Sequence, residues 1–177
     1  MSKPASGDRK GGRIVSSAHL AEGGAPALSE FEYGLIISGN AFERWIVRCM
    51  AAAGYPDLSA LDVLVVHSVN HRARDKRLAD ICFVLNIEES HLVSYALKKL
   101  VRARLVEAEK RGKEAVFRTT GEGAEACARY RAVREPCLVE TVRALGNFDE
   151  AEIASVARFL RALSGLYDQA ARAATSL

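Results

Sequence analysis

Five side chains between residues 91 and 102 have the types and the spacing of a surface that reads nucleic acid. They are an imidazole, a hydroxyl, a phenol and two cations, and a helix would bring them to one face: His91, Ser94, Tyr95, Lys98 and Arg102. The first three could meet base edges or nearby phosphates, and the two cations could pair with guanine O6 and N7 or with phosphate. A solvated helix face could carry the same stripe by chance, so the neighbouring segments decide between the two interpretations.

The segment that carries this face, NIEESHLVSYALKKLVRAR over residues 86–104, has the period of a two-faced helix. Its opposite side is apolar and suits packing in a core: Val93, Ala96, Leu97 and Leu100. Lys99 falls on the flank of the polar stripe, where we expect a phosphate contact. The pattern therefore predicts a recognition helix over about residues 88–103.

A shorter apolar helix is expected just before it, over residues 76–85 (KRLADICFVL). Asn86 tolerates the left-handed conformation that ends a helix, so a tight turn would join the two helices. Helix, tight turn and helix form the helix-turn-helix arrangement, in which the first helix braces the second in the major groove. Arg77, at the start of the brace, would touch backbone phosphate.

A change of period after Arg104 predicts a small hairpin. Residues 105–110 and 114–119 alternate like strands, and Gly112 can supply a positive φ in the turn between them. Three cations would cluster at the tip of this wing, which spans about residues 105–119: Lys110, Arg111 and Lys113. Cationic tips are common on solvated surfaces, but one that follows a helix-turn-helix favours contact with phosphate or with the minor groove.

Long helical patterns flank this region on both sides. An aromatic and aliphatic stripe runs from a capping box at residues 29–32 to Gly54. After the hairpin, Pro136 should kink a further helix, and residues 149–152 open a last helix with a heptad-like seam. Such stripes can be intramolecular core, but their extent favours an interface shared by two subunits. The expected interface residues are Phe31, Leu35, Phe42, Ile153, Val156, Leu160, Leu163 and Tyr167.

Charge is unevenly distributed along the chain. The net charge is only +3, but residues 67–118 hold 12 Lys and Arg against 7 Asp and Glu. Residues 27–66 and 119–177 are instead slightly acidic. The basic excess thus surrounds the expected recognition helix, where it could neutralise phosphates.

Metal and thiol chemistry have weak support in the sequence. His67 and His71 lie four residues apart on a helix capped by Ser59, but no nearby Cys, Asp or Glu completes a site, so we expect no metal and no cofactor. The cysteines lack the CxxC spacing of zinc sites: Cys49, Cys82, Cys127 and Cys137. We expect a cytoplasmic protein, because neither a signal sequence nor a run of about 18 apolar residues is present.

The chain divides into four expected regions. Residues 1–26 are rich in Gly and Pro and lack aromatic residues, which predicts a flexible tail. Residues 27–58 would form an N-terminal dimerisation helix, residues 59–119 a winged helix-turn-helix DNA-binding domain, and residues 120–177 C-terminal dimerisation helices. The expected fold class is therefore mainly α with a small β-wing.

From about Ser29 onward, this order of elements resembles the MarR family of bacterial winged-helix transcription regulators. The matching segments are RLADICFVLNIEES for the brace and turn, HLVSYALKKLVRARLV for the recognition helix and first wing strand, and FRTTGEG for the end of the wing. In the last segment, Thr120 and Gly123 stand where the family has Leu-Thr-x-x-Gly. The resemblance implies a homodimer with interdigitated first and last helices, recognition helices in successive major grooves, and a small-molecule effector bound between the dimer helices and the DNA-binding lobe.

Three departures from the family pattern affect this expectation. Arg111 and Lys113 stand in place of the family's Asp-x-Arg motif in the wing, so we expect the internal salt bridge that shapes the wing to be absent. The segment from brace to recognition helix is longer than is typical. Arg104 replaces the usual glycine before Leu105, so the recognition helix is expected to end differently.

The leading hypothesis is a dimeric, sequence-specific DNA-binding regulator that reads an inverted repeat with half-sites about 10 base pairs apart. Its expected partners are double-stranded DNA, a second copy of the chain and a small-molecule effector, with no membrane. Two alternatives stay open: a winged helix that binds protein rather than DNA, and a thiol- or metal-responsive sensor that uses Cys49 and Cys82. An enzyme is not expected, because no nucleophile–base pair, phosphate loop or carboxylate cluster is present.

Overall fold

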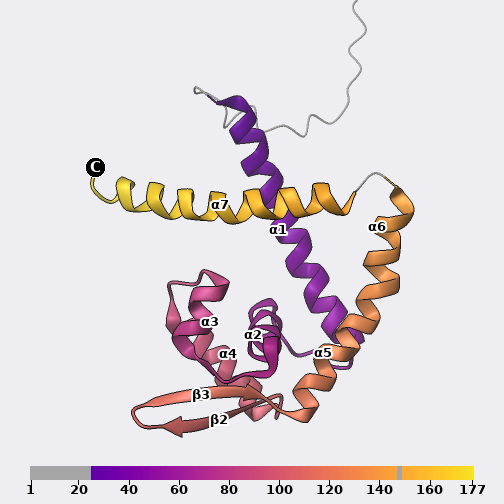
Figure 1. Ribbon diagram of the computed structural model, residues 1–177, viewed down its shortest axis with the longest axis vertical. Helices are drawn as coiled ribbons and strands as arrows, with labels where there is room; N and C mark the ends of the chain where they lie inside the picture. Colours follow the sequence, from indigo (N-terminus) through magenta and orange to yellow (C-terminus); the bar gives the residue numbers. More distant parts are fainter. Residues whose placement is uncertain (1–24, 147–148) are drawn as a thin grey trace, which may run out of the picture.

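The computed structural model describes residues 25–146 and 149–177, so residues 1–24 of the expected tail lie outside the described residues. The described chain is mostly helical, with three short strands and one π-helical segment, η2 (Figure 1). In chain order its elements are α1 Pro26–Ala52, α2 Ala60–Asn70, the 3₁₀ turn η1 His71–Ala73, β1 Lys76–Arg77, α3 Leu78–Leu85, α4 Ser90–Arg102, β2 Val106–Arg111, β3 Glu114–Thr119, α5 Gly121–Arg134, η2 Glu135–Val139, α6 Glu140–Leu145 and α7 Glu150–Ala174.

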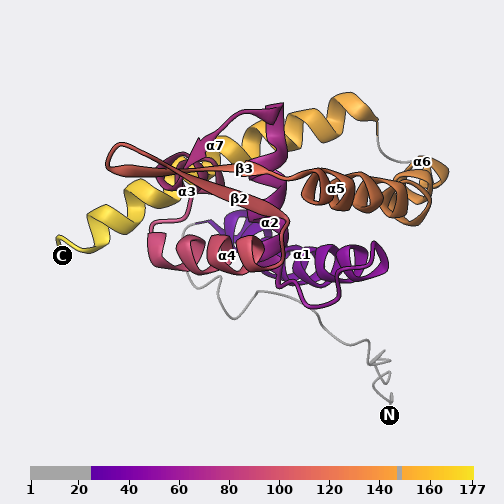
Figure 2. The same ribbon diagram turned by 90° about the horizontal axis from the view of Figure 1, so that it is seen from below.

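The helix α2 lies at the centre of the molecule and contacts α1, α3, α4 and α5 (Figure 1). The hairpin of β2 and β3 extends along one edge of this group, beside α4 (Figure 2). On the opposite side, the long helix α7 crosses α1. Although α1 and α7 are long, neither they nor any other helix in the described ranges has an apolar stretch of the kind needed to cross a membrane.

The strands form one antiparallel sheet in the order β1-β3-β2. Phe117 in β3 is opposite Lys76 of β1 on one side and Ala108 of β2 on the other. The expectation of a helix over residues 76–85 is wrong at its start, because Lys76 and Arg77 are extended and pair with β3. The brace helix α3 therefore begins at Leu78, and the wing is anchored to the segment that precedes it.

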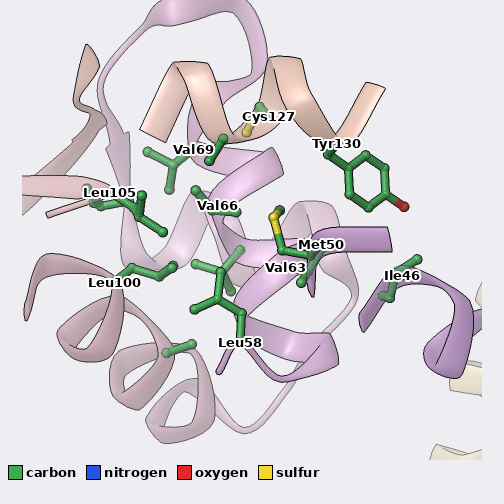
Figure 3. Packing of buried hydrophobic residues seen from close by; sticks show 14 of the residues in the cluster. Ile46, Met50, Leu58, Val63, Val66, Val69, Leu100, Leu105, Cys127 and Tyr130 are labelled. Carbon is green, nitrogen blue, oxygen red and sulfur yellow. The ribbon is translucent and has the colours of Figure 1, made fainter. Parts of the chain in front are cut away.

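The hydrophobic core gathers around α2 (Figure 3). Val63 and Val66 of α2 are fully buried between Met50 of α1 and Leu100 of α4. Cys127 of α5 covers the same cluster from the other side. Because four helices converge on these residues, the position of the recognition helix is set by packing rather than by its own sequence alone.

The helix starts follow the sequence in two places and depart from it in one. Ser59 caps α2 as expected, in a capping box with Asp62, and Asp149 caps α7 by accepting a hydrogen bond from Ala151 N at 3.2 Å. The capping box expected at Ser29 is wrong, because α1 already begins at Pro26 and Ser29 lies within it. Proline suits the first helical position, where its missing N–H costs nothing.

Four of the described helices are followed by a residue of positive φ: α1 by Gly54, α3 by Asn86, α4 by Arg104 and α6 by Gly146. After α4, Leu105 N donates to Leu100 O at 3.0 Å, which is the long hydrogen bond of a Schellman motif. The expectation that α4 ends differently without glycine is therefore wrong. Arg104 adopts a φ of 60°, a conformation that costs an L-residue about 1 kcal/mol.

The end of α4 is tied to the start of α5 by Thr120. Its Oγ1 donates to Arg104 O at 2.6 Å and accepts a hydrogen bond from Gly123 N at 3.0 Å. A Cβ at position 123 would overlap the carbonyl oxygen of Leu105 and lie 2.7 Å from Thr119 Cγ2. These contacts explain the Thr-x-x-Gly pattern: the threonine makes the tie and the glycine allows the close approach.

Pro136 changes the helical path without ending it. The residues around it, Glu135–Val139, form the π-helical segment η2, which joins α5 to α6. Proline has no N–H to donate, and the chain accommodates this by a local change of hydrogen-bond pattern. Pro136 therefore does interrupt the regular α-helix, as expected.

Candidate nucleic-acid interface

The helix α4 has the two faces that its sequence predicts. Its apolar face is fully buried, through Val93, Ala96, Leu97 and Leu100. On the opposite face, His91, Lys98 and Arg102 are exposed, Tyr95 is 65% exposed and Ser94 is half-buried. The helix starts at Ser90, which places His91 in its first turn, near the end that a helix-turn-helix directs toward base edges.

The side chains on the exposed face of α4 contact one another. The rings of His91 and Tyr95 meet edge to face with centroids 6.5 Å apart, and Lys98 Nζ lies 5.6 Å from the Tyr95 centroid. Arg102 Nε donates to Lys98 O at 3.3 Å. Neither cation has an ion-pair partner in the described part of the chain, so both charges are available to an anion.

Lys99 is engaged within the protein. Its Nζ lies 2.7 Å from Asp62 Oδ2 and donates to Asp57 O at 2.6 Å. The Asp62 carboxylate is buried and also accepts hydrogen bonds from Ser59. This ion pair joins the start of α2 to α4, so the ammonium that the sequence suggested for phosphate contact instead neutralises a buried carboxylate.

The wing contains an ion-pair network that the sequence comparison did not predict. Arg111 pairs with Glu109 at 3.1 Å and with Asp75 at 2.6 Å. Arg118 pairs with Glu107 at 3.2 Å and also contacts Glu109. The expectation that the wing lacks an internal salt bridge is therefore wrong: Glu109 takes the acidic role from the β2 strand itself.

This network sets the charge state of the wing. The hydrogen bond from Arg111 lowers the pKa of the Glu109 carboxyl, and the same bond raises the pKa of the guanidinium. About half of each side chain is exposed, so water and salt weaken the pair. Arg111 is thus engaged with two carboxylates, whereas Lys110 and Lys113 are exposed and have no ion-pair partner among the described residues.

A groove runs between α4 and the sheet. Its volume is about 1140 Å³, and its floor is apolar, with Leu97, Ala108 and Phe117 among its residues. Lys98 and Arg102 lie on one wall and Arg77 on the other, where Arg77 pairs with Glu114 at 3.3 Å. The groove therefore brings Arg77 of the brace together with four of the predicted residues of α4, whereas His91 and Lys99 do not line it: Ser94, Tyr95, Lys98 and Arg102.

The long helices leave most of their expected interface residues uncovered. Phe42 is 52% exposed and Val156 is 55% exposed, and Ile153, Leu160 and Tyr167 are exposed as well. Other large apolar side chains on these helices are also exposed, which the sequence interpretation did not single out: Leu28, Ile36, Ile37, Phe159 and Leu166.

Some of the expected interface residues contact this same chain. Phe31 meets Phe159 edge to face with centroids 5.3 Å apart, and Tyr167 donates to Glu32 Oε1 at 3.1 Å. Leu163 is only 8% exposed, so it is buried without a second subunit, and Leu35 is half-buried. Part of the apolar stripe on α1 and α7 therefore packs within the chain, and the rest is exposed on its surface.

Some of the histidines and cysteines pack in the core, whereas His71 and Cys137 are exposed. His67 stacks edge to face on Tyr130 at 4.6 Å, and within the described ranges no three His, Cys, Asp or Glu side chains cluster as metal ligands do. Burial raises the pKa of the Cys127 thiol to about 11, and the buried Cys49 donates to Tyr130 O. All four thiols are free, and Cys82 is half-buried at the edge of the groove beside α4.

Comparisons with known proteins agree with this geometry. Residues 58–123 match the family model of the winged helix DNA-binding domain. No curated protein matches the chain in sequence. Solved structures match it in fold: CouR from Rhodococcus jostii RHA1 bound to p-coumaroyl-CoA, with a TM-score of 0.60 and 12% identity over 76% of this chain and 91% of CouR, is one of them.

Two further structures have the same fold. A MarR-family transcriptional regulator from Rhodococcus sp. RHA1 has a TM-score of 0.59 and 13% identity over 77% of this chain and 93% of its own. Wild-type MarR from E. coli in its apo form has a TM-score of 0.54 and 16% identity over 73% and 93% of the two chains. Residues 58–123 are thus similar to the winged helix DNA-binding domain family, and the chain shares its fold with these solved structures, which confirms the expected fold class.

Proposed function

We propose that the protein is a homodimeric transcription regulator that binds DNA sequence-specifically. The observation that carries the proposal is the exposed face of α4, on which Lys98 and Arg102 have no carboxylate partner among the described residues, while the other face is fully buried. In a winged helix DNA-binding domain this face enters the major groove, where His91, Ser94 and Tyr95 would meet base edges or phosphates.

The wing supplies the second contact in this proposal. Lys110 and Lys113 stand exposed at its tip with no ion-pair partner in the part of the chain that the structure describes, and Arg111 lies between them in sequence. A hairpin tip of this kind fits the minor groove or its phosphates. Arg77 would reach phosphate at the other wall of the groove after release from Glu114, an exchange that costs little because the pair is exposed.

A second copy of the chain would cover the exposed stripes of α1 and α7. These stripes are too extensive to be scattered surface residues, and a twofold axis would let one stripe meet its equivalent. Two recognition helices would then read an inverted repeat with half-sites about 10 base pairs apart. The CouR structure, in the same fold, contains p-coumaroyl-CoA, and this supports a small-molecule effector for the present chain as well.

The proposal is tested by selecting a consensus site from random DNA and measuring its affinity for the full chain at several salt concentrations. We expect Lys98→Ala and Arg102→Ala each to weaken binding by about tenfold to a hundredfold, because each removes one or two charge-assisted hydrogen bonds. The matched control is Arg129→Gln on α5, whose exposed guanidinium pairs with Glu125 away from the groove.

Two results would contradict the proposal. Failure to select any sequence, with no salt-dependent binding to any fragment, would argue against DNA as the partner. If both variants kept a protein partner while neither they nor the parent bound DNA, the winged helix would be a protein-interaction module instead.

A further inference from the structure

Two adjacent apolar side chains are exposed on the outer surface of the brace helix α3. Phe83 is 87% exposed and Val84 is 68% exposed, although Ile81 in the same helix is fully buried. Among the large apolar residues that the structure describes, only Leu177 at the end of the chain is more exposed than Phe83. Scattered apolar residues are common on protein surfaces, so the surroundings of this pair decide whether it belongs to an interface.

The pair borders a hollow between α3, β1 and the wing. The volume of this hollow is about 740 Å³, which leaves room for a side chain of another molecule. All of its lining residues lie between Arg74 and Val116, so it is separate from the exposed stripes of α1 and α7. Figure 1 shows α3 and the free end of the β2–β3 hairpin at the same edge of the molecule, away from α5 and α6.

The charged residues around the hollow are mixed in sign, unlike the exposed cations of α4. Arg77 pairs with Glu114 at 3.3 Å, and Arg111 pairs with Asp75 at 2.6 Å. A phosphate group on this surface would meet the carboxylates as well as the cations, so the surface does not suit DNA. A protein surface with both signs of charge is the better match.

Two opposite charges on this surface have no ion-pair partner among the described residues. Arg74 is exposed, and Asp80 is exposed and accepts the hydrogen bond of Arg77 N at 3.0 Å. Both line the hollow together with Phe83 and Val84. A cation, an anion and an apolar pair on one face complement the same set on a second copy of the chain. A twofold axis between the copies brings the cation of each to the anion of the other.

Neighbouring operators would supply this twofold axis. The proposed dimer reads an inverted repeat, so two dimers bound side by side on DNA are related by a twofold axis midway between their sites. The winged domains that face each other across this axis are therefore equivalent. The edge with α3 and the wing takes no part in the proposed dimer interface, which leaves it free to meet a neighbouring dimer.

We propose that dimers bound to neighbouring operators contact each other through this surface, with Phe83 against the hollow of the neighbour and Arg74 opposite its Asp80, and so bind DNA cooperatively. This inference rests on the proposed DNA-binding function. The apolar contact is too small to hold two dimers together in free solution. On DNA, the adjacent site raises the effective concentration of one dimer beside the other, so a weak contact is sufficient.

The experiment titrates the full chain onto duplexes with one or two copies of the selected consensus site and measures binding by quantitative gel shift. The distance between the centres of the two sites is increased one base pair at a time. At favourable spacings, we expect the second dimer to bind about 5-fold to 100-fold more tightly than the first. The effect should recur about every 10 base pairs, because other spacings turn one dimer away from its neighbour around the DNA axis.

Two variants remove the contact in different ways. Phe83→Glu places a carboxylate in the apolar contact, and Arg74→Glu sets a like charge against Asp80 of the neighbour. Each should make the second dimer bind no more tightly than the first, whereas Phe83→Met keeps an apolar side chain of similar size and should retain most of the effect. Every variant is compared with its own single-site affinity, so a change in direct DNA contact is not counted as lost cooperativity. Arg129→Gln on α5, outside the hollow, should change nothing.

The proposal is overturned by any of three results. One is independent filling of the two sites at every spacing, and another is cooperativity that Phe83→Glu and Arg74→Glu leave unchanged. The third is a shift of Phe83→Glu from dimer to monomer in sedimentation equilibrium, because Phe83 would then belong to the dimer interface. In the first two cases, normal binding to the single site leaves the proposed function intact. If the parent chain bound no single site, both the function and this inference would be contradicted.

Discussion

The winged domain and the long helices treat their apolar residues in opposite ways. Between Ile46 and Tyr130 the chain closes a continuous core in which α2 is surrounded on all sides. The helix α7, by contrast, buries only Leu163, and it exposes an apolar stripe that includes Val156 and Phe159. The difference teaches that the core between α1 and α5 is closed within one chain, whereas α7 leaves an apolar surface that a second copy would cover in the proposed dimer.

The substitution expected to destabilise the core between α1 and α5 most is Gly123→Ala. The added Cβ would overlap Leu105 O at the junction of α4 and α5, so we expect a loss of about 3–5 kcal/mol in the free energy of unfolding, measured by chemical denaturation. Gly121→Ala is the control, because a Cβ there meets nothing within 4 Å. Equal stability of the two variants would show that the junction is looser than these contacts require.

The proposed dimer interface on α7 is tested by the double substitution Val156→Glu and Leu160→Glu. Both side chains are exposed in the single chain, so the fold should survive while a dimer that buries them loses about 2–4 kcal/mol of association free energy. Sedimentation equilibrium should show a shift to monomer. Phe83→Glu on α3, also at an exposed apolar residue, should leave the oligomeric state unchanged, and an unaltered dimer in the double variant would contradict the proposed interface.

Two adjacent lysines of α4, Lys98 and Lys99, can be used to distinguish DNA binding from stability. Lys99→Met removes the partner of the buried Asp62 carboxylate and should lower the free energy of unfolding by about 1–2 kcal/mol, since the exposed part of the lysine is screened by solvent. Lys98→Met should change stability by less than about 0.5 kcal/mol and reduce DNA affinity instead. Thermal unfolding and DNA titration of both variants provide the test, and the reverse result would exchange the roles assigned to the two residues.

The smallest effect is expected from Arg104→Gly, and it is stabilising. Glycine adopts the observed φ of 60° without strain. The hydrogen bonds that Leu105 N and Thr120 Oγ1 donate to backbone carbonyls are unaffected. After the extra chain entropy of glycine is subtracted, about 0.5–1 kcal/mol of stabilisation should appear in urea unfolding. A loss of stability would mean that the arginine side chain contributes more than its conformation costs.

Local patterns predicted the elements, and long-range contacts decided what the sequence missed. The period of three and four residues placed Val93 and Leu97 inside and Lys98 outside, and Ser59 marked the start of α2. The strand β1 has only two residues and exists because β3, some forty residues later, pairs with it. No pattern within residues 76–85 could show this.

The same limit explains the misassigned charges of the site. Lys99 lies on the flank of the polar stripe by periodicity, but its partner Asp62 comes from a different helix. Arg111 pairs with Glu109 of its own strand, and it meets its second acceptor, Asp75, only because the hairpin packs beside β1. Residue type and spacing therefore located the surface, while packing decided which cations are free.

The Thr120 tie has a mechanical consequence. Because its hydrogen bonds join the end of α4 to the first turn of α5, a rotation of α5 must carry the C-terminal end of the recognition helix with it. In the proposed dimer, the distance between the two α4 helices would then change through movement of the α5 helices rather than through bending within the winged domain. The regular helix of α5 is first interrupted at η2, beside Pro136, and a hinge for this movement would lie there.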